Sequence, residues 1–216
     1  LVGKVALEWK QPTFGADVYL ARDTFSVLDE ESEAALAAAI GSLSKLIGPP
    51  QEIDVGVIQG MQDLCDWAKV MKVVRGSEAA ASRLDWIREF KPEMGPGFRE
   101  RFEAGGLYTQ NEISEATNKR EIIKTYLDKL LSDNIIMVVP AAPTSPPPVS
   151  SQEKVYDNLR SKNELYNCIA PLGQLPQISL PLGNVKGLPI GLGVIGGNGS
   201  DELLLEIANQ LNNLES

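Results

Sequence analysis

Three apolar runs between residues 133 and 197 constrain the fold more than any other part of the chain. The first, residues 135–139, reads IIMVV and follows a helical pattern. An unbroken run of this kind is typical of a strand that is covered on both faces of its sheet. Prolines at positions 140, 143 and 146–148 then end the run, because proline cannot donate a hydrogen bond to a neighbouring strand. The segment therefore predicts a buried strand followed by a proline-rich loop.

The second and third runs, residues 177–182 and 188–195, flank the short segment 183–187. A glycine at each end of so short a connection favours a β-hairpin. We therefore expect the strands near 135–139, 177–182 and 189–195 to be neighbours in one sheet.

Amphipathic helices are predicted on either side of these runs. Apolar residues at positions 36, 40, 43 and 47 form one stripe of a helix over 29–47. Thr109 and Glu112 have the spacing of a capping box at the start of a helix over 109–133. Further helices are predicted over 152–166 and 201–213. Alternating helices and buried strands indicate an α/β layered domain.

The remaining segments give weaker patterns. Short strands are predicted over 18–25 and 53–58, and residues 2–9 form a mixed apolar segment suited to a connection. Two helices are predicted between 60 and 102, one around Trp67 and one around Trp86, the second capped by Ser77 and ended near Lys91. For the tryptophan-containing helix that precedes the loop at 93–97, core packing of Trp86 is the favoured interpretation, and a helix covering a substrate cleft is the alternative.

The charge balance limits the partners. The 216 residues contain 20 Lys and Arg against 29 Asp and Glu, a net charge of −9, with no block of basic residues. Nucleic-acid binding needs a concentrated positive face, so no nucleic-acid partner is expected. The apolar runs are far shorter than the roughly 20 residues that span a bilayer, so no membrane partner is expected. The sequence predicts a soluble chain, with the cytoplasm as the expected compartment.

Histidine is absent, and the only cysteines are Cys65 and Cys168. Catalytic groups of the Ser-His-Asp or Cys-His type need an imidazole base, so neither is predicted within the chain. A metal site of His and Cys ligands is not predicted either, because two cysteines are too few ligands for one, and no metal is expected. The two cysteines are interpreted as buried thiols rather than as a disulfide.

Two short motifs are better explained by structure than by catalysis. Residues 191–196 match G-x-G-x-x-G, but these glycines lie inside an apolar strand pattern and not between a strand and a helix. We interpret them as glycines that allow close packing, and expect no cofactor, nicotinamide and flavin included. Ser42 and Lys45 match S-x-x-K, but they fall in an amphipathic helix without the accompanying motifs of β-lactamase-like enzymes. A solvated helix face explains that pair.

Five short segments follow one another in a distinctive order toward the carboxyl end. They are the strand at 135–139, PAAPT from Pro140, GQLPQISLPLG from Gly173, GLPIGLGVIG from Gly187 and SDELL from Ser200. In this order they resemble the carboxyl-terminal part of the amidase signature family. Residues 19–25 and 86–101 are similar to the plant-type branch of that family, which contains indole-3-acetamide amidohydrolases and a non-hydrolytic receptor of the chloroplast import machinery.

The resemblance implies that residues 1–216 are the carboxyl-terminal portion of a single amidase-like domain, with a mixed central sheet flanked by helices. Family members hydrolyse amides with a Ser-Ser-Lys triad in a glycine- and serine-rich signature, and this chain contains no such stretch. The implied function is part of an amidase that cleaves the C–N bond of a small, apolar or aromatic amide and is inactive alone. A non-catalytic, amidase-like binding or receptor module is the alternative.

By the same resemblance, the loops at 141–145 and 167–174 would line an acyl or aryl pocket. Their candidate substrate-binding residues are Pro143, Thr144, Cys168 and Leu172, and purely structural loops are the alternative. No charged residue is clearly placed to bind a substrate carboxylate. A fold cut across its sheet should also leave open strand edges and an apolar face, through which two copies could pair as a homodimer.

Overall fold

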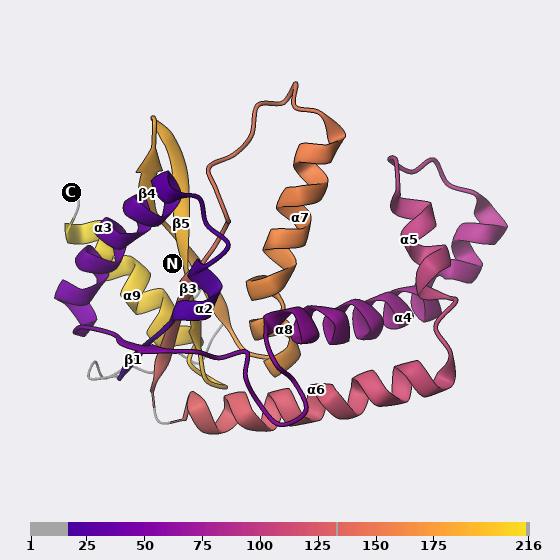
Figure 1. Cartoon of the computed structure of the whole chain (residues 1–216), viewed down its shortest axis with the longest axis horizontal. Coiled ribbons are helices and arrows are strands. Elements are labelled where there is room, and N and C mark those ends of the chain that lie inside the picture. The colour runs from indigo at the N-terminus through magenta and orange to yellow at the C-terminus, as the bar shows by residue number, and fades with distance from the viewer. Residues whose placement is uncertain (1–16, 133, 215–216) are drawn as a thin grey trace.

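A mixed five-stranded sheet with helices on both faces is formed by the described residues, 17–132 and 134–214, of the computed structural model (Figure 1). The strands are β1 (Val18–Ala21), β2 (Gln51–Ile53), β3 (Ile136–Pro140), β4 (Gln177–Val185) and β5 (Leu188–Gly196), in the spatial order β2-β1-β3-β5-β4. β1 runs parallel to β2 and β3, whereas β5 runs antiparallel to β3 and β4. The three apolar runs are therefore neighbours in one sheet, and the predicted α/β fold is confirmed.

β3 lies at the centre of the sheet, and all five of its residues are buried. Met137 and Val139 face one layer of helices, and Ile136 and Val138 face the other. Successive side chains of a strand point to opposite faces, so a strand between two helix layers needs apolar residues at every position. This requirement accounts for the unbroken run in the sequence.

Two layers of helices cover the sheet. α4 (Leu64–Phe90), α6 (Gln110–Leu130) and α8 (Ile169–Gly173) contribute to the core that contains Met137 and Val139. α3 (Glu30–Ile47) and α9 (Asp201–Leu214) contribute to the core on the opposite face. The other helices are α2 (Arg22–Phe25), α5 (Phe98–Gly105) and α7 (Glu153–Asn167). None of the helices in the described ranges is both long enough and apolar enough to cross a membrane.

The helices predicted over 29–47, 109–133, 152–166 and 201–213 correspond to α3, α6, α7 and α9. α3 begins after Asp29, whose side chain accepts a hydrogen bond from the Ser32 amide at 2.8 Å. The capping box at α6 is confirmed, because Thr109 and Glu112 each bind the backbone amide of the other. The local capping signal therefore located the start of α6 correctly, whereas the Asp29 cap of α3 was found only in the structure.

The predicted hairpin is also confirmed, with a tighter turn than expected. The turn consists of Lys186 and Gly187, with φ values of 53° and 85°. Two successive residues with positive φ are typical of the turn that matches the right-handed twist of hairpin strands. Residues 183–185 therefore belong to β4 and not to the connection.

The strand predicted over 18–25 is wrong beyond Ala21. Residues Arg22–Phe25 form α2, and Thr24 Oγ1 donates a hydrogen bond to the Ala21 carbonyl at 2.6 Å. A threonine hydroxyl can satisfy a nearby carbonyl in this way and stabilise a turn in place of a strand. The apolar residues of this segment therefore do not continue the ladder.

The strand predicted over 53–58 is wrong beyond Ile53. The amides of Val55 and Gly56 donate to Asp23 Oδ2 at 3.0 and 2.8 Å. Because these donors bind a side chain, they are not available to a neighbouring strand. The apolar residues that alternate in this segment do not mark a strand; Val55, for example, is fully buried in the core.

The prediction of two helices between 60 and 102, the second starting at Ser77, is wrong about that start. α4 is continuous for 27 residues and begins after Asp63, whose carboxylate caps it. Ser77 lies inside this helix, where its hydroxyl donates to the Val74 carbonyl at 3.1 Å. The helix ends at Lys91, which adopts a left-handed conformation before Pro92.

The two tryptophans of α4 have different environments. Trp67 is fully buried, whereas Trp86 is 51% exposed and contradicts the expectation of core packing. Trp86 lies near the end of α4 that projects away from the sheet (Figure 1). The apolar segment predicted at 2–9 lies outside the described residues.

Candidate ligand pocket beside the proline-rich loop

A hollow of about 240 Å³ lies at the carboxyl end of β3. It is formed by the loop after β3, by α7 and by the facing parts of β4 and β5. Its lining residues are Ala142, Pro143, Thr144, Ser145, Pro146, Pro147, Leu159, Asn163, Pro181, Pro189, Ile190 and Gly191. Ligands of α/β proteins commonly bind outside strand ends of this kind. We call this hollow the proline pocket.

The loop that forms one wall is held at both ends. At its start the Ala141 amide donates to the Gly191 carbonyl at 2.9 Å, which continues the pairing of β3 with β5 by one residue. At its far end the Tyr156 hydroxyl donates to the carbonyls of Pro148 and Val149 at 2.9 and 3.2 Å. The prolines between these points restrict the backbone further. The wall is therefore fixed before any ligand binds.

The lining favours a small neutral ligand. None of the lining residues in the described part is Asp, Glu, Lys or Arg. The polar side chains are Thr144, Ser145 and Asn163, and the rest of the lining is apolar or glycine. An apolar cavity of about 150 Å³ can hold benzene, so this pocket has room for one aromatic ring or a branched acyl group.

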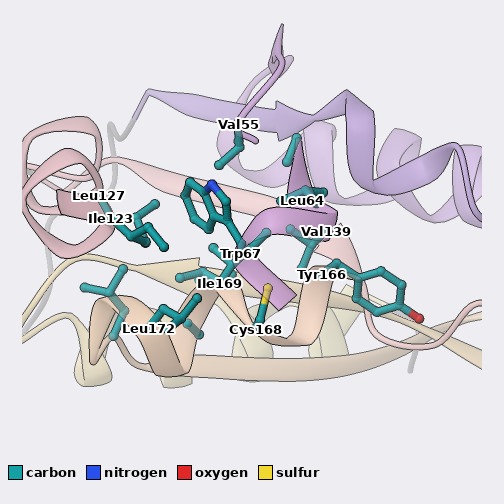
Figure 2. Packing of buried hydrophobic residues seen from close by; sticks show 14 of the residues in the cluster. Val55, Leu64, Trp67, Ile123, Leu127, Val139, Tyr166, Cys168, Ile169 and Leu172 are labelled. Carbon is teal, nitrogen blue, oxygen red and sulfur yellow. The ribbon is translucent and has the colours of Figure 1, made fainter. Parts of the chain in front are cut away.

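Asn163 is the polar residue whose orientation the structure explains best. The Tyr166 hydroxyl donates to Asn163 Oδ1 at 2.8 Å, and the Tyr166 side chain is otherwise buried (Figure 2). Burial raises the pKa of Tyr166 well above its usual range, so the phenol stays protonated as a donor. Because the Asn163 oxygen is occupied, its NH₂ group is the part left to donate to a ligand.

The Thr144 hydroxyl lies near the Asp29 carboxylate at the start of α3. Burial acts to raise the pKa of Asp29, but the hydrogen bond from the Ser32 amide, together with the nearby Thr144 hydroxyl and Lys162 ammonium, outweighs it, and the net pKa is lowered. Asp29 therefore stays ionised with its charge balanced by neighbours from α3, the loop and α7. The charge stays outside the pocket lining.

The predicted substrate-binding residues fall into two groups. Pro143 and Thr144 line the proline pocket. Cys168 and Leu172 are 2% and 0% exposed and lie with Trp67 and Ile169 in the core on one face of the sheet (Figure 2). Burial raises the pKa of the Cys168 thiol to about 12, so it is not a thiolate at neutral pH. The structure does not bring these two residues to the pocket.

The cysteines themselves are both free. The interpretation as buried thiols is correct for Cys168 and wrong for Cys65, which is exposed in the first turn of α4. The first turn of a surface helix has a solvent-facing side, and position 65 falls on it.

Sequence reasoning missed Leu159 and Asn163 of α7 and Pro181 and Ile190 of the hairpin. Leu159 and Asn163 are four residues apart, so they share one face of the helix. That spacing was visible in the sequence, but nothing in it shows which face of α7 turns toward the loop.

A second hollow of about 330 Å³ lies at the opposite end of β3 and β5. It is lined by Asp128, Leu131, Ser132, Asn134 and residues 197–200. Asp128 already accepts hydrogen bonds from Lys124 and Asn198. Although this hollow is larger, it has little apolar wall, so we favour the proline pocket as the ligand site.

The two motifs set aside in the sequence have structural explanations. Gly191, Gly193 and Gly196 all lie within β5 and not in a turn before a helix. A Cβ atom on Gly193 would lie 2.9 Å from Val139 Cγ2, so the glycine allows close packing with β3. Ser42 and Lys45 are exposed on α3. Within the described residues, no three His, Cys, Asp or Glu side chains are grouped in a way that suits a metal ion.

Residues 20–205 match the profile of the family described as Amidase. The chain belongs to the Amidase family. Among curated relatives, it is 32% identical over 143 residues to Amidase 1 of Oryza sativa. This match covers 66% of this chain and 33% of the rice protein. It is 27% identical over 139 residues to the chloroplastic outer envelope protein 64 of Arabidopsis thaliana, covering 64% and 24%.

The fold of this Amidase-family chain also matches a solved structure, titled crystal structure of amidase. The TM-score is 0.77 at 21% identity, and the match covers 94% of this chain and 46% of that one. The chain thus spans about a third or less of the curated relatives and less than half of the solved chain. The predicted family resemblance is confirmed.

Proposed function

We propose that this chain provides the sheet core and one wall of the substrate pocket of an amide hydrolase that acts on small, uncharged, apolar or aromatic amides. The proline pocket carries this proposal, because its described lining combines apolar and neutral polar side chains and includes no charged residue. The family match supports amide hydrolysis as the reaction. We further propose that residues 1–216 are the carboxyl-terminal portion of one amidase-like domain.

The catalytic groups would come from the rest of such a domain. Amide hydrolysis needs an activated nucleophile and a base within hydrogen-bond reach of each other, about 2.6–3.2 Å apart. Thr144 and Ser145 line the pocket, but no Lys lines it within the described residues. The Ser-Ser-Lys triad that the family resemblance implies would therefore face the pocket from outside this chain.

The pocket lies beside an edge at which further structure can join. Pro181 of the lining belongs to β4, the last strand in the order, which has one strand partner in the described part of the chain. Proline is tolerated on an edge strand because it has no amide to pair there. A strand added at this edge would bring its own residues next to Pro181 and close the pocket.

Within the pocket, the chain's own residues would bind and orient the substrate. The prolines and Ile190 would contact its apolar group. The NH₂ group of Asn163, held by Tyr166, would donate to a polar atom of the amide. Positioning of this kind lowers the barrier because the reacting groups are already oriented.

A non-catalytic binding module is the second candidate function. It is favoured by one observation: the described lining contains the hydroxyls of Thr144 and Ser145 but no lysine that could serve as their base. Both functions predict binding of a small neutral amide, and they differ in turnover once the missing part is supplied.

Two measurements test the proposal. Saturation-transfer NMR should show indole-3-acetamide and phenylacetamide binding to the chain, with weaker binding to the variant Asn163→Leu and no effect of the control Ser132→Ala in the other hollow. Indole-3-acetate should bind more weakly than its amide, since none of the described lining residues is a cation. Equal binding of the acid and the amide, or no effect of Asn163→Leu, would refute this use of the pocket.

Turnover separates the two functions. The chain alone should not hydrolyse these amides or react with a fluorophosphonate probe. In a chimera, this chain replaces the matched region of rice Amidase 1. The chimera should hydrolyse the amides and react with the probe if this chain serves an enzyme. It should bind the amides without turnover if this chain is a binding module. Hydrolysis by the chain alone that is lost in Ser42→Ala or Lys45→Ala would overturn the proposal in favour of the S-x-x-K motif.

A further inference from the structure

The turn between β5 and α9 contains the single Asn-Gly pair of the sequence, Asn198 and Gly199. An asparagine loses its side-chain amide most readily when glycine follows it, because glycine has no Cβ atom to hinder attack by its own nitrogen. Both residues are exposed, and both line the polar hollow at this end of β3 and β5. Water therefore has free access to the pair.

The turn itself favours glycine after the asparagine. The Ser200 amide donates to the Gly197 carbonyl at 3.2 Å, which closes a four-residue turn around the pair. Gly199 has a φ of 80°, a value that residues with a Cβ atom adopt only with strain. A side chain at position 199 would slow the reaction but would also strain the turn, so the fold keeps the reactive pair.

The reacting nitrogen and carbon are accessible. Among the described backbone carbonyls, none accepts a hydrogen bond from the Gly199 amide. A Cβ atom built on Gly199 would meet no atom from other parts of the described chain within 4 Å, so the turn has space for a five-membered ring. One contact holds the asparagine side chain, because Asn198 Nδ2 donates to Asp128 Oδ1 at 3.2 Å. The side chain has to leave this contact before it reacts.

We propose that Asn198 is a site of spontaneous modification, at which the backbone of the chain converts asparagine into aspartate and isoaspartate. The Gly199 nitrogen attacks Asn198 Cγ, the Cγ–Nδ2 bond breaks, and Nδ2 leaves as ammonia with the proton of the Gly199 amide. Water then opens the cyclic imide at one of its two carbonyl carbons and leaves a carboxylate at position 198. Water is the only co-reactant, and this chemistry is independent of the amide hydrolysis proposed above.

The new carboxylate changes the contact between the turn and α6. The hydrogen bond from Asn198 Nδ2 to Asp128 is lost, and the two carboxylates that replace it repel each other. Asp128 Oδ2 already accepts from Lys124 Nζ at 2.6 Å, so one lysine faces both charges. Asp201 and Glu202 already occupy the first turn of α9, so its amino terminus does not offset the added charge. The modification therefore weakens the attachment of the turn to α6.

Peptide mapping of the whole 216-residue chain after prolonged incubation at neutral pH tests the modification, with isoaspartyl methylation as a second readout. Asn198 should be converted and Asn198→Gln should abolish the signal. Asn184 is the internal control, because it is also exposed beside a tight turn but is followed by the β-branched Val185. Asp128→Ala releases the Asn198 side chain and should speed the conversion. An intact Asn198, or equal conversion of Asn184, would overturn the proposal.

A double-mutant cycle tests the consequence. Asn198→Asp introduces the carboxylate at once and should lower the thermal unfolding midpoint by roughly 2–4 °C. In an Asp128→Ala background the same substitution should leave the midpoint unchanged, because the repelling partner is absent. The matched control Asn184→Asp keeps the oxygen that accepts from the Gly187 amide and should also have no effect. An equal loss with and without Asp128 would overturn the weakening of this contact.

Discussion

Replacing Trp67 by phenylalanine tests how the core beside β3 holds the loop after β2. Trp67 is fully buried, and its Nε1 donates to the Gly56 carbonyl at 3.1 Å. Its ring also meets the Tyr126 ring edge to face, with centroids 6.2 Å apart and planes at 89°. Figure 2 shows it surrounded by residues from several segments, Val55, Ile123 and Ile169 among them.

The expected loss of stability has two parts. Phenylalanine has no donor, so the Gly56 carbonyl loses a buried partner, which costs about 1–3 kcal/mol. The smaller ring leaves part of the indole volume empty, and this adds a fraction of the 3–5 kcal/mol that complete truncation of a buried aromatic residue costs. We therefore expect Trp67→Phe to lower the free energy of unfolding by about 2–4 kcal/mol.

Trp86→Phe is the matched control, because it makes the same chemical change at a side chain that is 51% exposed. It should change the free energy of unfolding by less than about 0.5 kcal/mol, as is usual for surface positions. Urea unfolding followed by far-UV circular dichroism measures both variants. Equal effects of the two substitutions would refute the role assigned to Trp67.

Three further predictions concern packing, pH and thiol access. Gly193→Ala should destabilise the chain by about 1–3 kcal/mol, because the new Cβ would lie 2.9 Å from Val139 Cγ2. In the control Gly41→Ala the new Cβ has no atom within 4 Å, so this change should stabilise α3 by about 0.5–1 kcal/mol. Thermal unfolding compares the two variants. The pKa of Asp29 is lowered from its ordinary 3.8, so its stabilising effect is present above that pH and is lost as the pH falls through the lower, folded-state value. Asp29→Asn, which keeps a capping oxygen, should flatten the acid side of a plot of unfolding midpoint against pH, and an unchanged slope would argue against this assignment. Exposed Cys65 should react with a thiol reagent in the native chain and buried Cys168 only after unfolding, so two native equivalents would contradict the core described here.

Local sequence patterns were sufficient for the parts of the fold that depend on neighbours along the chain. The run at 135–139 predicted β3, because a strand between two helix layers is apolar at every position. Thr109 and Glu112 predicted the start of α6, since a capping box needs only residues three apart. Gly183 and Gly187 predicted the β4–β5 hairpin, because a short turn also depends only on residues that are close in the sequence.

Tertiary contacts decided the features that depend on distant segments. β2 ends at Ile53 because Asp23, about 30 residues earlier in the chain, binds the amides of Val55 and Gly56. No periodicity in residues 53–58 contains that information. The single helix α4 was missed because Ser77 has the chemistry of a cap, and only its surroundings show that its hydroxyl bonds to the helix itself.

The candidate site divides in the same way. The prolines after β3 marked a loop at the end of a strand, and Pro143 and Thr144 of that loop do line the pocket. Cys168 and Leu172 belong to a comparable loop region by sequence, but their side chains turn into the core, and Asn163 of α7 lines the pocket instead. A sequence shows which residues share a helix face or follow a strand. The direction in which that face points is set by how whole helices and strands pack, because each element buries the side that removes the most apolar surface from water.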